Sequence, residues 1–300
     1  MKHTALAFVT AIIVALISYA PALPAEAGEG GGRHSHGAHA GHTHAGEAGE
    51  ATVSLETAPE QLSTGTPTFI FFVIKDSKGA PVQELTATHD RMLHAVIIGE
   101  DFSVFGHIHP EDSGPLPPEM RARGRYPVRF TFPKAGRYLI AVDGAIQGRH
   151  FSQQFLVSVA GGPRMAGFAK DVSREKRFGE YTVTLTATPE RIVAGREATL
   201  GFHISENGRP VTDLEPYLSA PLHLAILLTD LNSFVHAHGE LPDGPPGHPP
   251  VAHVHGEVPH AFGPRIEARV VFPVKGTYQV FGELQHQGRV VVISFMVEAE

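Results

Sequence analysis

One segment of the sequence occurs twice in the chain and indicates its fold. Residues 81–111 read PVQELTATHDRMLHAVIIGEDFSVFGHIHPE, and they align without a gap with residues 210–240, PVTDLEPYLSAPLHLAILLTDLNSFVHAHGE. A second match follows when the later copy is given extra loop residues: FPKAGRYLIAVDGAIQGRHFSQQFLVSV, from Phe132, resembles FPVKGTYQVFGELQHQGRVVVISFMVEA, from Phe272. Self-similarity over this length predicts two copies of one structural unit.

Each copy has the sequence pattern of short β-strands. Apolar and polar residues alternate in runs rich in Val, Ile, Phe, Tyr and Thr, and turn signals such as DSKGAP at 76 and ENGRP at 206 separate the runs. We therefore expect an all-β chain of two tandem antiparallel β-sandwich domains, immunoglobulin-like or cupredoxin-like, with about seven strands each. The first domain is predicted at 51–160 and the second at 178–300, joined by a Gly-rich, charged linker at 161–177.

The amino-terminal residues predict export. An uncharged apolar run from Ala5 to about Ala20 follows Lys2, and Ala25-Glu26-Ala27 has the form of a signal-peptidase site. We expect a signal peptide over residues 1–27 and a periplasmic or extracellular protein. The alternative is an uncleaved N-terminal membrane anchor, because the apolar run is just long enough to span a bilayer.

Residues 28–50 consist mainly of Gly, Ala, His and Glu, so they cannot bury enough apolar surface to fold alone. We predict a disordered segment whose imidazoles could bind Cu, Ni or Zn, or else a solvated linker that needs no metal. The histidines of this tail are His34, His36, His39, His42 and His44.

The composition excludes several classes of protein. The net charge of -7 and the lack of a Lys/Arg-rich run argue against a nucleic-acid partner. The chain has no cysteine, which excludes disulfides, thiolate nucleophiles and cysteine-ligated zinc or blue copper. It has 20 histidines, an excess that points to metal binding through nitrogen.

The histidines of the repeated segment form a predicted constellation. A two-residue hairpin loop between strands at 93–98 and 102–109 puts Gly99 opposite Phe102, and therefore His94 opposite His107. His109 then lies on the same face two residues farther along. Three imidazoles in such a patch could bind one ion. The same hairpin register in the second copy brings three more histidines together. The predicted metal ligands are therefore His94, His107, His109, His223, His236 and His238. The alternative is structural, because gene duplication copies core histidines equally well.

Further candidates are weaker. Met92 is predicted on the face of His94, where a thioether would favour Cu(I). The loop histidines His253 and His255 could lend ligands to the His223 site, or the loop is merely rigid and polar. Four more histidines are expected to be structural: His89, His150, His203 and His286.

No motif indicates an enzyme: the sequence has no phosphate-binding glycine loop, no nucleophile elbow and no H-E-x-x-H. We therefore expect a protein without catalytic activity. A metal held by three imidazoles does keep an open coordination position, as catalytic zinc does.

The stretches PVTDLEPYL, HLAILLTDLNSFVHAHG and FPVKGTYQVFGELQHQG resemble secreted β-sandwich domains that recur beside bacterial heavy-metal and copper efflux systems, loosely akin to the YtkA-like and CopC-like proteins. The resemblance implies an exported metal-handling role. We expect a non-enzymatic metal-binding protein that acts as a buffer or carrier for copper, with zinc or nickel next, and that has a membrane efflux or envelope complex as a partner. This chain departs from the pattern in having Gly239 where the first copy has Pro110. It also lacks a histidine at the predicted mature end, so the amino-terminal copper site of CopC-like proteins is not carried over. The alternative function is a tandem immunoglobulin-like interaction module of the cell envelope.

Overall fold

A computed structural model describes residues 51–242 and 258–300 of the chain. The first domain contains seven strands and two short helices. They are β1 (Ala51–Ala58), β2 (Pro67–Asp76), β3 (Leu93–Gly99), β4 (Phe105–Ile108), η1 (Pro110–Ser113), α1 (Pro118–Ala122), β5 (Arg125–Thr131), β6 (Gly136–Ile146) and β7 (Arg149–Val159).

The second domain contains strands β8 to β17, two of which are only two residues long. They are β8 (Glu175–Phe178), β9 (Tyr181–Thr188), β10 (Glu197–Glu206), β11 (Arg209–Pro210), β12 (Leu214–Glu215), β13 (His223–Leu228), β14 (Phe234–His238), β15 (Arg265–Val271), β16 (Gly276–His286) and β17 (Arg289–Ala299).

Each domain is a sandwich of two antiparallel sheets. In the first domain, the sheet β1-β2-β5 packs on the sheet β4-β3-β6-β7. In the second, strands β8, β9, β10, β11 and β15 form one sheet, and β12, β13, β14, β16 and β17 form the other. The prediction of two tandem antiparallel β-sandwich domains is confirmed.

Alternation along the strands builds each core. In β5, Tyr126, Val128 and Phe130 are buried while the residues between them are more exposed, as the two-residue period of a strand requires. In β9, Tyr181 and Val183 begin the same pattern. Each domain therefore has its own apolar core between its two sheets.

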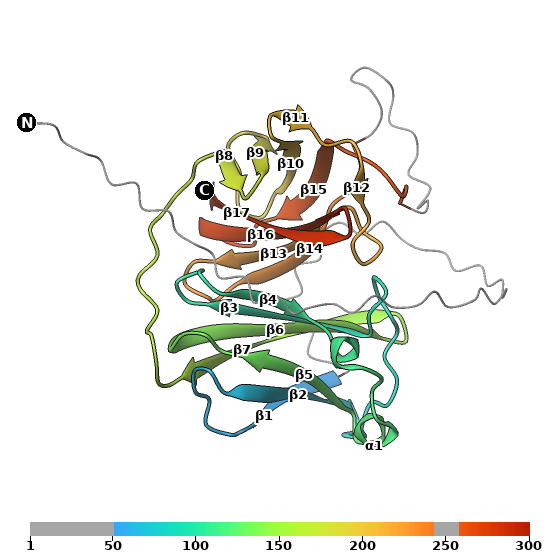
Figure 1. The fold of residues 1–300 in the computed structure, drawn as a ribbon. Helices are drawn as coiled ribbons and strands as arrows, with labels where there is room; N and C mark the ends of the chain where they lie inside the picture. Colours follow the sequence, from blue (N-terminus) through green and yellow to red (C-terminus); the bar gives the residue numbers. More distant parts are fainter. Residues whose placement is uncertain (1–50, 243–257) are drawn as a thin grey trace, which may run out of the picture.

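Two strands are buried on both faces, because the domains pack on each other. All seven residues of β3 and all six of β13 are buried. Their second faces meet in a third apolar cluster, so the four sheets are stacked in layers (Figure 1). We call this cluster the interdomain core; its buried members are Val96, Ile98, Phe102, Phe105, Leu139 and Ala141 of the first domain and Ala225, Leu227, Leu231, Phe234, Phe281 and Met296 of the second.

The two domains use equivalent surfaces in this contact. Phe105 and Phe234 occupy matched repeat positions, and both belong to the interdomain core. Phe105 stacks on Phe281 with ring centroids 4.6 Å apart. The arrangement resembles an isologous dimer interface within one chain.

The predicted hairpin register is wrong by two residues. The structure pairs Ile98 with Phe105 and Val96 with His107. The loop is longer than predicted, because Phe102 adopts a positive φ of 57° and the Gly99 amide donates to the carbonyl oxygen of Val104 at 3.0 Å. A slip of two residues changes the partners but keeps every side chain on its face.

The second copy has the same corrected register, in which His223 pairs with His238 and not with His236. The predicted face of the histidines is therefore right, although their cross-strand partners are not.

Within the part of the chain that the structure describes, no helix is long and apolar enough to span a bilayer. The predicted signal peptide (1–27), the His-rich tail (28–50), and His253 and His255 lie outside the described residues.

Candidate metal centre

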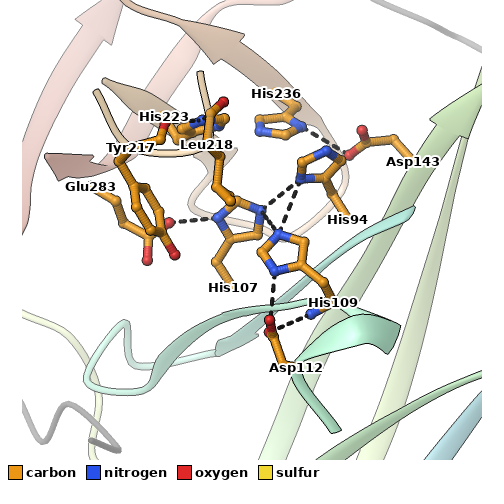
Figure 2. A network of polar contacts seen from close by, with 10 residues as sticks. All are labelled: His94, His107, His109, Asp112, Asp143, Tyr217, Leu218, His223, His236 and Glu283. Atoms are coloured by element: carbon orange, nitrogen blue, oxygen red, sulfur yellow. Dashed lines mark hydrogen bonds and ion pairs between the residues drawn. The ribbon is translucent and has the colours of Figure 1, made fainter. Parts of the chain in front are cut away.

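All six predicted ligands lie between the two domains. We call His94, His107 and His109 the first triad, and His223, His236 and His238 the second triad. Rings of the two triads approach each other, with His94 and His236 centroids 5.4 Å apart and those of His107 and His223 5.7 Å apart. The two predicted patches therefore form one histidine centre, of which Figure 2 shows all the rings except that of His238.

One nitrogen of each ring in the first triad points toward a common spot. The Nδ1 atom of His94 lies 3.1 Å from Nε2 of His107, and Nε2 of His109 lies 3.2 Å from each of these atoms. The three rings converge in this way in Figure 2. His94 and His109 are each only 1% exposed, so this spot is screened from water.

The outer nitrogens of the first triad fix its tautomers. His94 Nε2 donates to the carbonyl oxygen of Thr88 at 3.0 Å. His107 Nδ1 donates to Glu283 at 2.5 Å, and His109 Nδ1 donates to Asp112 at 3.1 Å. Oxygens of carbonyls and carboxylates only accept hydrogen bonds, so these outer nitrogens carry the protons of the neutral rings.

The inner nitrogens of neutral rings in these tautomers present three lone pairs to one another. Lone pairs at such distances repel unless a cation lies between them. A tetrahedral ion about 2.0–2.1 Å from each nitrogen sets ligand nitrogens about 3.3 Å apart, close to the spacing of the triad. Outer hydrogen bonds to carboxylates and carbonyls are also the usual second shell of metal-bound histidines.

The second triad repeats the geometry of the first. The rings of His223 and His238 are 4.7 Å apart at 89°, and those of His94 and His109 are 4.9 Å apart at 87°. The ring centroids of His236 and His238 are 4.8 Å apart, and those of the matched pair, His107 and His109, are 4.6 Å apart. The ring centroids of His223 and His236 are 6.0 Å apart, which is more than the 5.3 Å between His94 and His107.

Two inner nitrogens of the second triad are buried without a hydrogen-bond partner. They are Nδ1 of His223 and Nε2 of His238, the atoms that match the inner nitrogens of His94 and His109. The outer nitrogen of His223 donates to the carbonyl oxygen of Tyr217 at 2.9 Å, which leaves the lone pair on Nδ1. A buried group without a partner is costly, and a metal ion would satisfy both nitrogens.

Each triad receives a carboxylate from the opposite domain. Asp143 on β6 of the first domain accepts a hydrogen bond from Nδ1 of His236 at 2.9 Å. Glu283 on β16 of the second domain accepts the hydrogen bond from His107. Asp143 and Glu283 occupy matched positions in the second repeat segment. Neither carboxylate was predicted from the sequence, although an acidic residue at the same place in two apolar strands is a usable signal.

The two triads are not identical at their third histidine. His109 is held by Asp112, whereas the matched position three residues after His238 is Leu241. Instead, the ring of His89 stacks on that of His238, with centroids 3.7 Å apart. One potential ligand atom from each of His89, His223 and His238 lies within 4.8 Å of the other two. A second such group consists of His94, His107 and His236.

His89 was expected to be structural, and the structure places it beside the second triad. It is a first-domain residue that reaches second-domain histidines, so only the packing of the domains reveals the relationship. No sequence pattern within one copy marks it, because its matched residue in the second copy is Leu218.

Burial controls the charge of the centre. Desolvation lowers the pKa of His94, His223 and His238 well below 6.5. It also lowers the pKa of His109, although Asp112 partly opposes this shift. Burial opposes protonation of His236 as well, but the charge and hydrogen bond of Asp143 outweigh it and raise the pKa of His236. Most triad imidazoles are thus kept neutral, as metal ligands must be.

The other described residues that were singled out in the sequence do not belong to the two triads. Met92 packs against the core of the first domain, so we do not include it among the ligands. His150 and His203 are exposed. His286 is bonded to the Tyr181 hydroxyl at 2.8 Å and to Asp213 at 3.1 Å, which is a structural role.

Several solved structures resemble the chain distantly. The Escherichia coli adhesin FdeC is 14% identical, with a TM-score of 0.24, over 85% of this chain and 65% of that one. Yersinia pseudotuberculosis InvD is 13% identical, with a TM-score of 0.25, over 82% and 57% of the two chains. Domains 4–9 of the surface layer protein SbsC are 12% identical, with a TM-score of 0.23, over 83% and 31%.

The chain spans less than two thirds of each of these structures. Likenesses this weak carry no argument about function.

Comparison by sequence is more specific. No curated protein matches the chain significantly. The model of one family, described as a domain of unknown function (DUF8832), matches residues 46–161 and again residues 176–300. Both domains are covered by these matches, and the chain therefore belongs to the DUF8832 family.

Proposed function

We propose that this chain is an exported, non-enzymatic metal-binding protein that uses its two histidine triads as a buffer or carrier for copper, with zinc and nickel as the next choices. The observation that carries the proposal is the first triad. Three inner nitrogens lie 3.1–3.2 Å apart, and each outer nitrogen donates to an oxygen that fixes the tautomer. Structural histidines normally have hydrogen-bond partners for their ring nitrogens, and a structural role does not explain why three nitrogen lone pairs point toward one position.

The donor set narrows the choice of metal. All the converging atoms are imidazole nitrogens, which suit Cu, Zn, Ni and Fe and are poor ligands for Ca or Mg. Without cysteine in the chain, no thiolate competes for the ion. We place copper first, and elemental analysis distinguishes it from zinc and nickel.

Burial favours storage or transfer of an ion over turnover of a substrate. His94 and His109 are nearly inaccessible, and the interdomain core adjoins them on the same strand faces. A single ion can enter such a place through local opening, whereas an organic substrate would require the domains to part. The predicted export signal and the resemblance further suggest delivery to a membrane efflux or envelope complex.

The test uses the full chain with the five tail histidines replaced by alanine, which we call the tail-silenced chain. Binding of Cu⁺, Zn²⁺ and Ni²⁺ is measured by elemental analysis and by competition against a chelator. We expect His109→Ala to weaken binding at least tenfold, about 1.4 kcal/mol. The control, His203→Ala, removes an exposed histidine and should leave affinity unchanged.

Equal affinity in the two variants would show that histidine number, and not the triad, governs binding. Failure of the tail-silenced chain to bind any of the three metals would overturn the proposal and favour the interaction module.

A further inference from the structure

We propose that the two domains exchange one histidine each, so that both ions are bound by ligands of both domains. The first shared set combines two histidines of the first domain with one of the second: His94, His107 and His236. The second shared set combines two histidines of the second domain with one of the first: His223, His238 and His89. This inference rests on the proposed function and specifies which residues bind each ion.

The position of His236 assigns it to the first-domain histidines. Its ring centroid lies 5.4 Å from that of His94 and 5.6 Å from that of His107, and Figure 2 shows it beside His94. In its own domain it lies 4.8 Å from His238 but 6.0 Å from His223. Ligands of one ion must all lie near one another. One potential ligand atom from each member of the first shared set lies within 4.8 Å of the other two.

A first-domain carboxylate orients the ring of His236. Asp143 lies opposite His94 in the pairing of β3 with β6, and it accepts the hydrogen bond from Nδ1 of His236 at 2.9 Å. In the neutral ring this proton leaves the lone pair on Nε2. The ring of His236 is therefore held by the first domain, although its backbone belongs to the second.

The matched residue His107 is held in the reciprocal way. Its Nδ1 donates to Glu283 of the second domain at 2.5 Å, and Glu283 lies opposite His223 in the pairing of β13 with β16. The central histidine of each triad is thus fixed by a carboxylate of the other domain. Such hydrogen bonds to the outer nitrogen are typical of metal-bound histidines.

His109 stays with the first shared set. Its Nε2 lies 3.2 Å from the inner nitrogens of both His94 and His107, and its outer nitrogen is bonded to Asp112. Loss of His109 should therefore weaken the same ion as loss of His236.

A tight turn brings His89 to the second-domain histidines. His89 and Asp90 are its two central residues, with φ angles of 50° and 62°, and two backbone hydrogen bonds between Thr88 and Arg91 close it. The hydroxyl of Ser219, in the matched turn of the second domain, donates to the carboxylate of Asp90. His89 therefore lies one residue from a direct contact between the domains.

The second shared set contains the nitrogens that most need a ligand. Nδ1 of His223 and Nε2 of His238 are buried without a hydrogen-bond partner, and the ring of His89 lies 3.7 Å from that of His238. Ligand nitrogens of one tetrahedral ion lie about 3.3 Å apart, whereas those of this set lie within 4.8 Å of one another. Rotation about the χ angles of His89 closes the difference and opens its stack on His238 when the ion binds.

The shared sets make each ion a link between the domains. Neither domain alone supplies a complete set, so an ion in either set binds the form of the chain in which the domains are packed. Ligands that bind one form of a protein stabilise it over the others.

The experiment removes one shared set at a time from the tail-silenced chain and titrates the remaining Zn²⁺ against a chromophoric chelator. His223→Gln with His238→Asn removes the second set, and His94→Gln with His109→Asn removes the first. Each amide keeps a hydrogen-bonding group near the outer nitrogen that it replaces and removes the inner nitrogen. The tail-silenced chain should bind two ions, and each of these two backgrounds should bind one.

Two variants then exchange roles between the backgrounds. Where the second set has been removed, His236→Asn keeps a donor for Asp143 and should weaken binding of the remaining ion at least tenfold. His89→Leu, which installs the residue found at Leu218 of the second copy, should leave that ion unaffected. Where the first set has been removed, His89→Leu should weaken binding at least tenfold and His236→Asn should have no effect.

The opposite pattern would overturn this inference. If each triad bound its own ion, His236→Asn would act only where the first set has been removed, and His89→Leu would act in neither background. Circular dichroism checks the fold of both backgrounds, and if one does not fold, the crossed comparison in the other decides.

Binding of a single ion by the tail-silenced chain, or of none by a folded background, would also overturn the inference while leaving the proposed function intact. Binding of no ion by the tail-silenced chain would overturn both.

Discussion

Removal of one carboxylate tests whether the domains share the centre. Glu283 belongs to the second domain, yet it accepts a hydrogen bond from His107 of the first triad at 2.5 Å. The variant Glu283→Gln keeps the size of the side chain and an oxygen that accepts this bond, so it removes mainly the negative charge. We expect this change in the second domain to weaken the Zn²⁺ affinity of the first triad, which belongs to the first domain.

The magnitude follows from the burial of the pair. Glu283 is 6% exposed, so solvent screens its interaction with His107 only slightly. A hydrogen bond to a charged group contributes about 1.5–3 kcal/mol and a neutral one about 1 kcal/mol. The loss of about 1–2 kcal/mol corresponds to roughly 5–30-fold in affinity, which overlaps the range of about 10–100-fold that is usual when a hydrogen-bond partner of a metal-bound histidine is removed.

The assay is competition titration of Zn²⁺ against a chromophoric chelator in the tail-silenced chain. Glu197→Gln, which removes the same charge from an exposed position of the second domain, is the control. Unchanged Zn²⁺ affinity in Glu283→Gln, or an equal loss in Glu197→Gln, would refute the argument that Glu283 acts through His107.

Three further predictions test other features of the centre. Although burial lowers it, Asp143 raises the pKa of His236 above 6.5, so titrations should find that Zn²⁺ affinity already falls as the pH drops from 7.5 to 6.5; it should fall further toward pH 4, because burial lowers the pKa of His89 to about 4 and that of His94 well below 6.5. For the same reason, thermal unfolding of the EDTA-treated chain should show stability falling as pH drops from 6.5 toward 4, because the unfolded state binds protons that these folded histidines do not; a flat profile would contradict the shifts. Phe105→Ala removes a ring stacked on Phe281 in the interdomain core, and urea unfolding should show a loss of about 3–5 kcal/mol; a loss below about 1 kcal/mol would mean that the domains do not pack there.

The repeat made most of the fold predictable. Alternation of apolar and polar residues indicated strands, and the ungapped match between 81–111 and 210–240 indicated two domains of one kind. The same alternation placed the six triad histidines on the correct strand faces. It could not fix the register, because that depended on the unexpected positive φ of Phe102, a residue that rarely adopts this conformation.

The contact between the two triads could not be predicted from the sequence of one repeat copy, because it depends on how the two domains pack. One signal did exist: the runs LHAVIIG and HLAILL are apolar at successive positions, which is typical of strands covered on both faces. That pattern predicts a second layer but does not say what forms it. The place of His89 follows only once the second domain is known to be that layer.

The interdomain core determines how the centre binds metal. Twelve buried apolar side chains of the two domains pack against one another beside the triads. The triad nitrogens are therefore brought together by packing, and the unpartnered nitrogens of His223 and His238 represent a cost that the apolar contact offsets. An ion that binds these two nitrogens removes the energetic cost of leaving them without a partner, and its binding free energy is not spent on bringing the domains together. Affinity should accordingly depend on interdomain packing: a cavity at Phe105 should weaken Zn²⁺ binding although Phe105 offers no ligand atom. In the tail-silenced chain, competition titration of Phe105→Ala should show this loss at a temperature where circular dichroism finds the β structure intact. Unchanged affinity would mean that each triad assembles within its own domain.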